Sequence, residues 1–267
     1  MSGETSMVAL SKEALRLRAW ALELLGGGGA GDAPEADPAA WSVFLRVEAC
    51  AAPLRNALRG AGVSAGAGEG ELDRAATRES QRILSARAQV ASLDRLAAKE
   101  GWRIAVLKGG VALQDAQPLD VGDLDLLVAP GDASALLEAL HGAGYAVHGE
   151  DNPAPGPRDH HYAPRYTPGS VPVEVHFRIG EMDTEHDLLG AAVPLERSRA
   201  LLRLSPADHL RHLLLHTVVH HPQRRGRLRD LLLIGAAARA LGDALGTVLC
   251  RPASTRGGSS ERSQDSR

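Results

Sequence analysis

The stretch VLKGGVALQDAQPLDVGDLDLLV, residues 106–128, places two aspartates in a segment that otherwise has the composition of a hydrophobic strand. We expect this strand at 123–128. Because side chains alternate between the two faces of a strand, Asp123 and Asp125 point to one side and the intervening leucines point into a core. Neighbouring carboxylates repel each other unless a cation lies between them, and Mg²⁺ suits such a pair. The alternative is two aspartates at the wet edge of a sheet.

A turn between a strand and a short helix precedes the two aspartates. The run 102–107 is β-like, Lys108-Gly109-Gly110 follows, and a short helix is expected at 111–116. Glycines allow the backbone to approach a phosphate, and the N-terminus of a helix favours an anion. Lys108, Gly109 and Gly110 are therefore candidate nucleotide-binding residues. The alternatives are a solvated lysine and a diglycine that simply ends a strand.

A third carboxylate, Glu174, interrupts the apolar run at 173–175. The sequences 161–167 and 171–177 flank a Pro-Gly-Ser turn, which predicts a hairpin whose second strand carries Glu174. We expect this strand to lie beside the strand that carries the two aspartates. Three acidic side chains next to a phosphate-binding turn suit two-metal phosphoryl or nucleotidyl transfer.

Composition excludes some classes of protein and leaves others open. The chain has 267 residues, 44% of them hydrophobic and 3% aromatic, with a formal net charge of −3, so it gives no overall basic footprint for nucleic acid. Cys50 and Cys250 are too far apart in sequence to indicate a metal site, and we expect no disulfide partner for either. No segment resembles a signal peptide or a membrane span, which predicts a cytoplasmic protein without a membrane partner.

The predicted fold class is α+β, with a small mixed β-sheet core between two helical regions. We expect a helical region with Gly-rich linkers at 1–100, the sheet core at 101–200, two helices within 201–250 and a disordered tail at 251–267. In the first region, the expected helices lie at 11–25, from Asp37-Pro38 onward with a bend near Pro53, and at 72–100.

The last two helices, expected at 206–221 and 228–245, carry two further patterns. Four histidines, His209, His212, His216 and His220, fall within about 80° of one helix face. They either pack on the sheet, line a substrate cleft or form a dedicated metal site, and the sequence leaves these alternatives open. A cluster of arginines precedes the last helix and either meets a phosphate or is simply solvated; its members are Arg224, Arg225, Arg227 and Arg229.

Together these motifs resemble the DNA-polymerase-β-like nucleotidyltransferase superfamily, and more closely the bacterial family described as uncharacterised nucleotidyltransferases. The resemblance rests on the order and spacing of four motifs and covers about residues 83–240. The motifs are LKGG at 107–110, GDLDLLV at 122–128, VEVHF at 173–177 and HLLLH at 212–216.

The resemblance implies that Asp123 and Asp125 bind Mg²⁺, as a two-metal site in which Mn²⁺ is an alternative ion. It implies that Glu174 is the third metal ligand and helps to deprotonate the acceptor, and that the diglycine turn holds the triphosphate of an NTP. The implied reaction moves an NMP to an acceptor that is a small molecule, a protein or an RNA.

One position departs from the family pattern. Leu119 stands about where the family has an arginine, four residues before the first aspartate. This departure keeps a second hypothesis open, in which the chain is a catalytically degenerate member that binds a nucleotide or a partner. A third hypothesis, an enzyme that modifies tRNA, requires a continuous basic groove that the net charge does not indicate.

Overall fold

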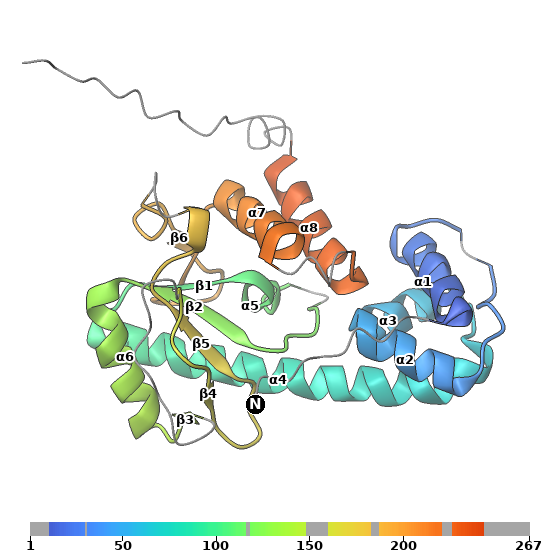
Figure 1. Cartoon of the computed structure of the whole chain (residues 1–267), viewed down its shortest axis with the longest axis horizontal. Helices are drawn as coiled ribbons and strands as arrows, with labels where there is room; N and C mark the ends of the chain where they lie inside the picture. The colour runs from blue at the N-terminus through green and yellow to red at the C-terminus, as the bar shows by residue number, and fades with distance from the viewer. Residues whose placement is uncertain are drawn as a thin grey trace, which may run out of the picture.

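The computed structural model describes residues 11–29, 31–115, 118–147, 160–182, 187–220 and 226–242. Within these residues the fold is α+β, as predicted: N-terminal helices lead into a mixed seven-stranded sheet, and two further helices follow (Figure 1). No helix in these ranges is long and apolar enough to cross a membrane.

Four helices form the N-terminal part: α1 (Lys12–Leu25), α2 (Pro38–Glu48), α3 (Ala51–Ala61) and α4 (Glu69–Glu100). The predicted starts are confirmed, because Ser11 accepts a hydrogen bond from the amide of Ala14 and Asp37 accepts one from the amide of Ala40. The predicted bend near Pro53 is wrong. Ala49 adopts a left-handed conformation (φ 47°) that ends α2, and Pro53 lies in the first turn of α3, where a missing amide hydrogen is tolerated.

The strands lie in the order β3–β4–β5–β2–β1–β7–β6. Their bounds are β1 (Ile104–Val106), β2 (Leu124–Val128), β3 (Ala146–Val147), β4 (Arg165–Tyr166), β5 (Val173–His176), β6 (Val193–Pro194) and β7 (Leu202–Arg203). Strand β2 runs antiparallel to β1 and parallel to β5, while β4 and β5 form the predicted antiparallel hairpin. The central strand is therefore β2, and the acidic residues Asp125 and Glu174 lie on β2 and its neighbour β5.

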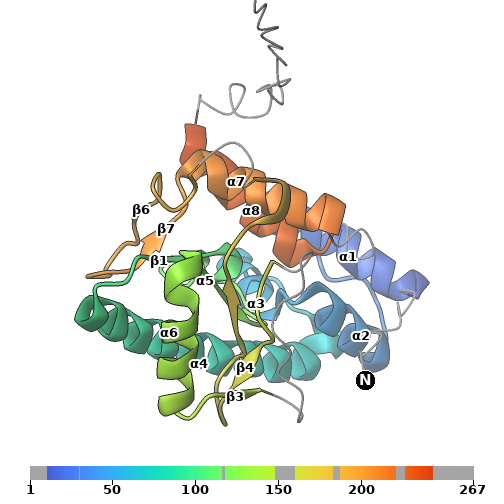
Figure 2. The ribbon, with the colours of Figure 1, turned by 60° about the vertical axis from the view of Figure 1, so that its left-hand side comes forward.

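The sheet has a larger apolar face and an opposite face that turns toward the C-terminal helices, where Ala105 and Leu127 belong to a smaller apolar cluster. On the apolar face, Leu124, Leu126 and Val128 pack against α4 and α6 (Pro130–Gly142), which confirms the predicted alternation along β2. Helices α7 (Pro206–Leu215) and α8 (Leu228–Leu241) lie on the opposite side of the sheet from α4 (Figures 1 and 2). The C-terminal helices thus lie over the face of the sheet to which the acidic side chains of β2 point.

Helix α4 joins the two halves of the molecule. Its first turns, including Leu72 and Ala76, pack with α1–α3, whereas its later turns, including Ile83 and Val90, pack under the sheet. Leu228 at the start of α8 also packs with the N-terminal helices. The division at residue 100 remains a prediction, and α4 contributes to both cores.

The C-terminal helices begin as predicted, at Pro206 and Leu228. A π-helical turn, η3 (His216–His220), continues α7, and α8 starts at Leu228. The expected end of the last helix and the tail at 251–267, together with Cys250, lie outside the described residues. Cys50 is buried among the N-terminal helices.

Candidate active site

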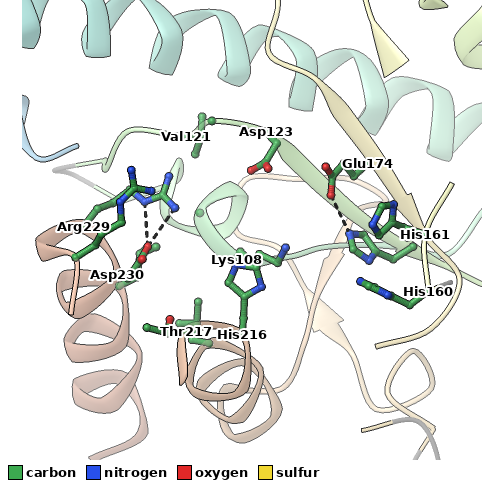
Figure 3. A pocket seen from close by; sticks show the side chains of 16 residues that line it. Lys108, Val121, Asp123, His160, His161, Glu174, His216, Thr217, Arg229 and Asp230 are labelled. Carbon is green, nitrogen blue, oxygen red and sulfur yellow. Dashed lines mark hydrogen bonds and ion pairs between the residues drawn. The ribbon is translucent and has the colours of Figure 1, made fainter. Parts of the chain in front are cut away.

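A cavity of about 510 Å³ opens on the acidic face of the sheet, between β2, β5 and the C-terminal helices (Figure 3). Residues from six segments line it: Lys108, Gly109, Val121, Gly122, Asp123, His160, His161, Glu174, His176, Leu213, His216, Thr217, Arg227, Arg229, Asp230 and Leu233. Four of the six predicted site residues are at this cavity or in its wall, and Asp125 lies directly behind it.

The pairing of β2 with β5 brings the predicted carboxylates together. The strands are parallel, and Asp125 lies opposite Glu174 in the register, so both side chains project from the same face. Ligand atoms of Asp125, Glu174 and His176 all lie within 4.8 Å of one another. Asp123, two residues earlier, points into the same space as Glu174 (Figure 3). This geometry is that of a group of side chains able to share a metal ion.

Asp125 is held by two basic side chains. Its carboxylate is only 1% exposed, and its Oδ1 atom accepts hydrogen bonds from Lys108 Nζ at 2.7 Å and His176 Nε2 at 2.9 Å. Burial by itself would raise the pKa of Asp125, but the Lys108 ammonium and the His176 imidazole hold it well below its usual range. Burial and the Lys108 charge would lower the pKa of His176, but its interactions with the carboxylates of Asp125 and Glu174 raise it. Asp125 therefore stays ionised in a buried site.

Asp123 behaves in the opposite way. Burial, followed by repulsion from the charge on Asp125, raises the pKa of Asp123 to about 6. Two carboxylates only two residues apart thus have pKa values pushed apart by their surroundings. A cation between the two carboxylates would remove this repulsion.

The predicted glycine turn has a different structure from the one expected. Helix α5 (Lys108–Ala112) begins at Lys108, three residues earlier than predicted, so the diglycine forms the first turn of the helix. Lys108 itself has a positive φ of 46°, a conformation that costs energy for a residue with a side chain and directs its ammonium to Asp125. Gly109 lines the cavity, whereas Gly110 is buried against Val106.

Leu119, the residue at the departure from the family pattern, is a packing residue. It is buried with Leu210 and Leu213 of α7. An arginine nevertheless reaches this segment from elsewhere: Arg82 of α4 donates two hydrogen bonds to the carboxylate of Asp120, at 2.9 and 2.6 Å. The segment before β2 is thus anchored by an ion pair from outside the motif.

The histidine stripe divides into two parts. His209 and His212 are buried, and burial lowers the pKa of the first to about 4 and of the second to about 3. They are neutral packing groups, as the first of the three alternatives predicted. His216 lines the cavity at the start of the π-helical turn, while the side chain of His220 lies outside the described residues.

Several residues at the cavity were not among the predicted site residues. The rings of His160 and His161 lie near the ring of His176 in tilted orientations, with centroids 5.5 and 5.1 Å from it. Arg229 forms an ion pair with Asp230 at 3.1 Å on the opposite wall (Figure 3). The arginine cluster before α8 was the sequence signal for Arg229; Arg224 and Arg225 of that cluster lie outside the described residues.

Comparison with protein families tests whether the chain belongs to the family that its motifs resemble. The model of the uncharacterised nucleotidyltransferase family matches residues 37–247, which is most of the chain. The chain belongs to this family. The predicted resemblance is confirmed, and membership supports a general role in nucleotidyl transfer. Nucleotidyltransferases generally use divalent metal ions, and the buried Asp125, Glu174 and His176 group of this family member has the donor atoms for one.

A solved structure and curated sequences add the following. The crystal structure of an antigenic nucleotidyltransferase-like protein from Paracoccidioides brasiliensis is similar at 17% sequence identity and a TM-score of 0.41, and the match covers 62% of this chain and 85% of that chain. Among curated proteins, no sequence matches.

Proposed function

We propose that the chain is a metal-dependent nucleotidyltransferase that moves an NMP from an NTP to an acceptor. In this proposal Asp123, Asp125 and Glu174 hold Mg²⁺, with two ions at full occupancy and Mn²⁺ as a substitute. The observation that supports it best is the register of β2 and β5, which sets Asp125 beside Glu174 at a cavity whose wall also carries Asp123. Bound Mg²⁺ would supply charge stabilisation at the reacting phosphate.

The residues of α5 would bind the phosphates of the nucleotide. Lys108 lines the cavity and its side chain is 14% exposed, so its ammonium can turn from Asp125 to a phosphate oxygen. Gly109 has no side chain to block the approach of the triphosphate to the backbone. Gly110 would contribute by letting α5 pack closely on β1, which fixes the position of the turn.

The chemistry requires one proton transfer by the protein. An acceptor hydroxyl oxygen forms the new bond to the α-phosphorus, the bond from that phosphorus to pyrophosphate breaks, and the hydroxyl proton passes to a carboxylate. Glu174 is suited to receive it, because its side chain is 21% exposed and lines the cavity, whereas Asp125 is buried behind Lys108. Most of the rate enhancement would come from positioning and electrostatics.

The test is Mg²⁺-dependent NTP binding, measured by calorimetry for the intact chain and for Asp123→Ala and Asp125→Ala. The matched control is Glu138→Ala, which removes an exposed carboxylate from α6. We expect the control to bind like the unmodified chain and both aspartate variants to lose Mg²⁺-dependent binding. Equal binding by all four proteins would show that no metal site lies at these aspartates.

A second candidate function is nucleotide or partner binding without transfer. It is favoured by the contacts of Asp125, whose Oδ1 atom is already satisfied by Lys108 and His176, and by the buried Leu119 at the position of the family arginine. Transfer of label from α-phosphate-labelled NTPs to candidate acceptors separates the two functions. Detectable transfer that Asp123→Ala abolishes excludes the non-catalytic candidate.

A further inference from the structure

A second cavity adjoins the candidate active site. It has a volume of about 400 Å³ and lies between α2, the first half of α4, the segment before β2 and the start of α8. Gly122, Arg227 and Arg229 line both cavities, so the two share a wall. Gly122 directly precedes Asp123, which places this wall next to the proposed metal ligands. A molecule bound in the second cavity would therefore end close to the reacting phosphate.

Arginines dominate the lining of this second cavity, which we call the arginine cleft. Its five arginines are Arg46, Arg78, Arg82, Arg227 and Arg229. Three carboxylates also line it, and each is already engaged: Glu71 with Arg74, Glu79 with the backbone amides of Ala51 and Ala52, and Asp120 with Arg82. The cleft thus has more positive than negative charge, and its carboxylates have partners of their own.

Two of the five arginines are available to a ligand. Arg46, on the last turn of α2, and Arg78, on α4, are both exposed. Within the part of the chain that the structure describes, neither forms a hydrogen bond or an ion pair with another residue. A planar guanidinium binds phosphate oxygens in pairs, and these two would not have to leave a carboxylate to do so.

The walls of the arginine cleft are fixed by buried contacts. Glu48 of α2 is 2% exposed; it accepts a hydrogen bond from the amide of Leu228 at 2.6 Å and pairs with Arg18 at 3.1 Å. Arg227 Nε donates to the carbonyl of Val47 at 2.7 Å. These contacts hold α2 against the start of α8. The segments that carry Arg46, Arg227 and Arg229 are therefore held together around the cleft, unlike arginines scattered over a solvated face.

We propose that the arginine cleft binds a phosphate of the acceptor, so that the acceptor of this nucleotidyltransferase is a phosphate-bearing molecule. This inference rests on the proposed function, because it names the class of molecule that receives the NMP. An RNA strand and a small phosphomonoester share the chemistry that the cleft recognises. With the phosphate held by Arg46 and Arg78, the remainder of the acceptor extends past Gly122 toward Asp123.

The experiment compares two double variants with the same change in charge. Arg46→Gln/Arg78→Gln alters the cleft, and Arg16→Gln/Arg59→Gln alters two exposed arginines that do not line it. Each protein is titrated with a short labelled oligoribonucleotide, with ribose 5-phosphate and, separately, with an NTP and Mg²⁺. We expect the cleft variant to bind one of the phosphate probes at least about tenfold more weakly, with a shallower salt dependence, and to bind the NTP normally.

The outcomes distinguish an RNA acceptor from a small phosphomonoester, and they distinguish failure of the arginine cleft from failure of the proposed function. Weakened binding of the oligoribonucleotide alone identifies an RNA acceptor, and weakened binding of ribose 5-phosphate identifies a small phosphomonoester. Equal binding of both probes by the cleft variant, its control and the unmodified chain overturns the inference. A loss of phosphate binding in the cleft variant supports a phosphate site in the arginine cleft, whatever the result for Asp123→Ala. Normal NTP binding by Asp123→Ala would count against the proposed function alone, so the two proposals can fail separately.

Discussion

The sheet core and the N-terminal helices each bury a carboxylate, but they satisfy it in different ways. Asp125 is 1% exposed and Glu79 is 3% exposed, so both have lost nearly all contact with water. Asp125 accepts hydrogen bonds from two basic side chains. Glu79 instead accepts hydrogen bonds from the backbone amides of Ala51 and Ala52, at 3.0 and 2.7 Å.

This difference reverses the direction of the pKa shift. Burial raises the pKa of Glu79 to about 7, because two amide dipoles only partly replace the lost hydration. The full charge on Lys108 outweighs the same penalty at Asp125, whose pKa is lowered. Glu79 fastens the start of α3 to α4 and tolerates protonation. Asp125 is kept as an anion, which is the state in which a carboxylate binds a cation.

The largest expected effect comes from replacing each carboxylate by its neutral amide. Asp125→Asn leaves the Lys108 ammonium without its buried partner and is expected to lower the free energy of unfolding by about 3 to 5 kcal/mol. Glu79→Gln keeps one acceptor oxygen for the amides and should cost only about 1 kcal/mol. Urea denaturation at neutral pH measures both values. Similar losses of stability in the two variants would mean that the charge of Lys108 does not make Asp125 more important for stability than Glu79.

A smaller effect, of up to about 3 kcal/mol, is expected in the pH dependence of stability. The pKa of Glu79 in the folded chain, about 7, lies above its ordinary value of 4.5, so the folded state binds this proton more tightly. The stabilisation is therefore complete below the ordinary value and is lost as the pH rises through the folded value. We expect the unmodified chain to lose stability between about pH 5 and pH 8 relative to Glu79→Gln.

Urea denaturation across this pH range measures the free energy of unfolding of the unmodified chain and of Glu79→Gln. The variant serves as the control because its side chain does not titrate at this position. Asp125 acts in the opposite direction: its pKa is lowered, so its contribution is present above the ordinary value and disappears only in acid. Parallel stability curves for the unmodified chain and Glu79→Gln would contradict the assignment of a raised pKa to Glu79.

The elements that the sequence predicted correctly are those set by local pattern. Alternation placed Leu124 and Leu126 in the core, and the Pro-Gly-Ser turn predicted the β4–β5 hairpin. The neighbouring positions of Asp125 and Glu174 followed from placing two acidic residues on adjacent apolar strands. Their roles as metal ligands remain a prediction. The alternation and the hairpin each depend on a few consecutive residues, which is why they could be inferred from them.

The features that the sequence did not indicate depend on contacts between distant segments. The positive φ of Lys108 is held by its pairing with Asp125, and nothing in Lys-Gly-Gly specifies it. The π-helical turn after Leu215 interrupts the regular period on which the histidine stripe was predicted. The arginine cleft combines side chains as far apart as Arg46 and Arg229, so neither could be linked to the other before the fold was known.

The smallest expected effects concern two glycines in helices that flank the sheet. A Cβ added at Gly110 would lie 2.5 Å from Cγ1 of Val106, a buried strand residue with a stiff side chain, so Gly110→Ala should cost about 2 kcal/mol. A Cβ at Gly131 in α6 meets nothing within 4 Å, and Gly131→Ala should stabilise by about 0.5 to 1 kcal/mol. Thermal unfolding measures both. If the two substitutions change the stability in opposite directions, packing on β1 constrains the second glycine of the turn, and only Gly109 is free to face a phosphate. If both substitutions change the stability in the same direction, that constraint is absent and Gly110 is again a candidate for direct contact with the nucleotide.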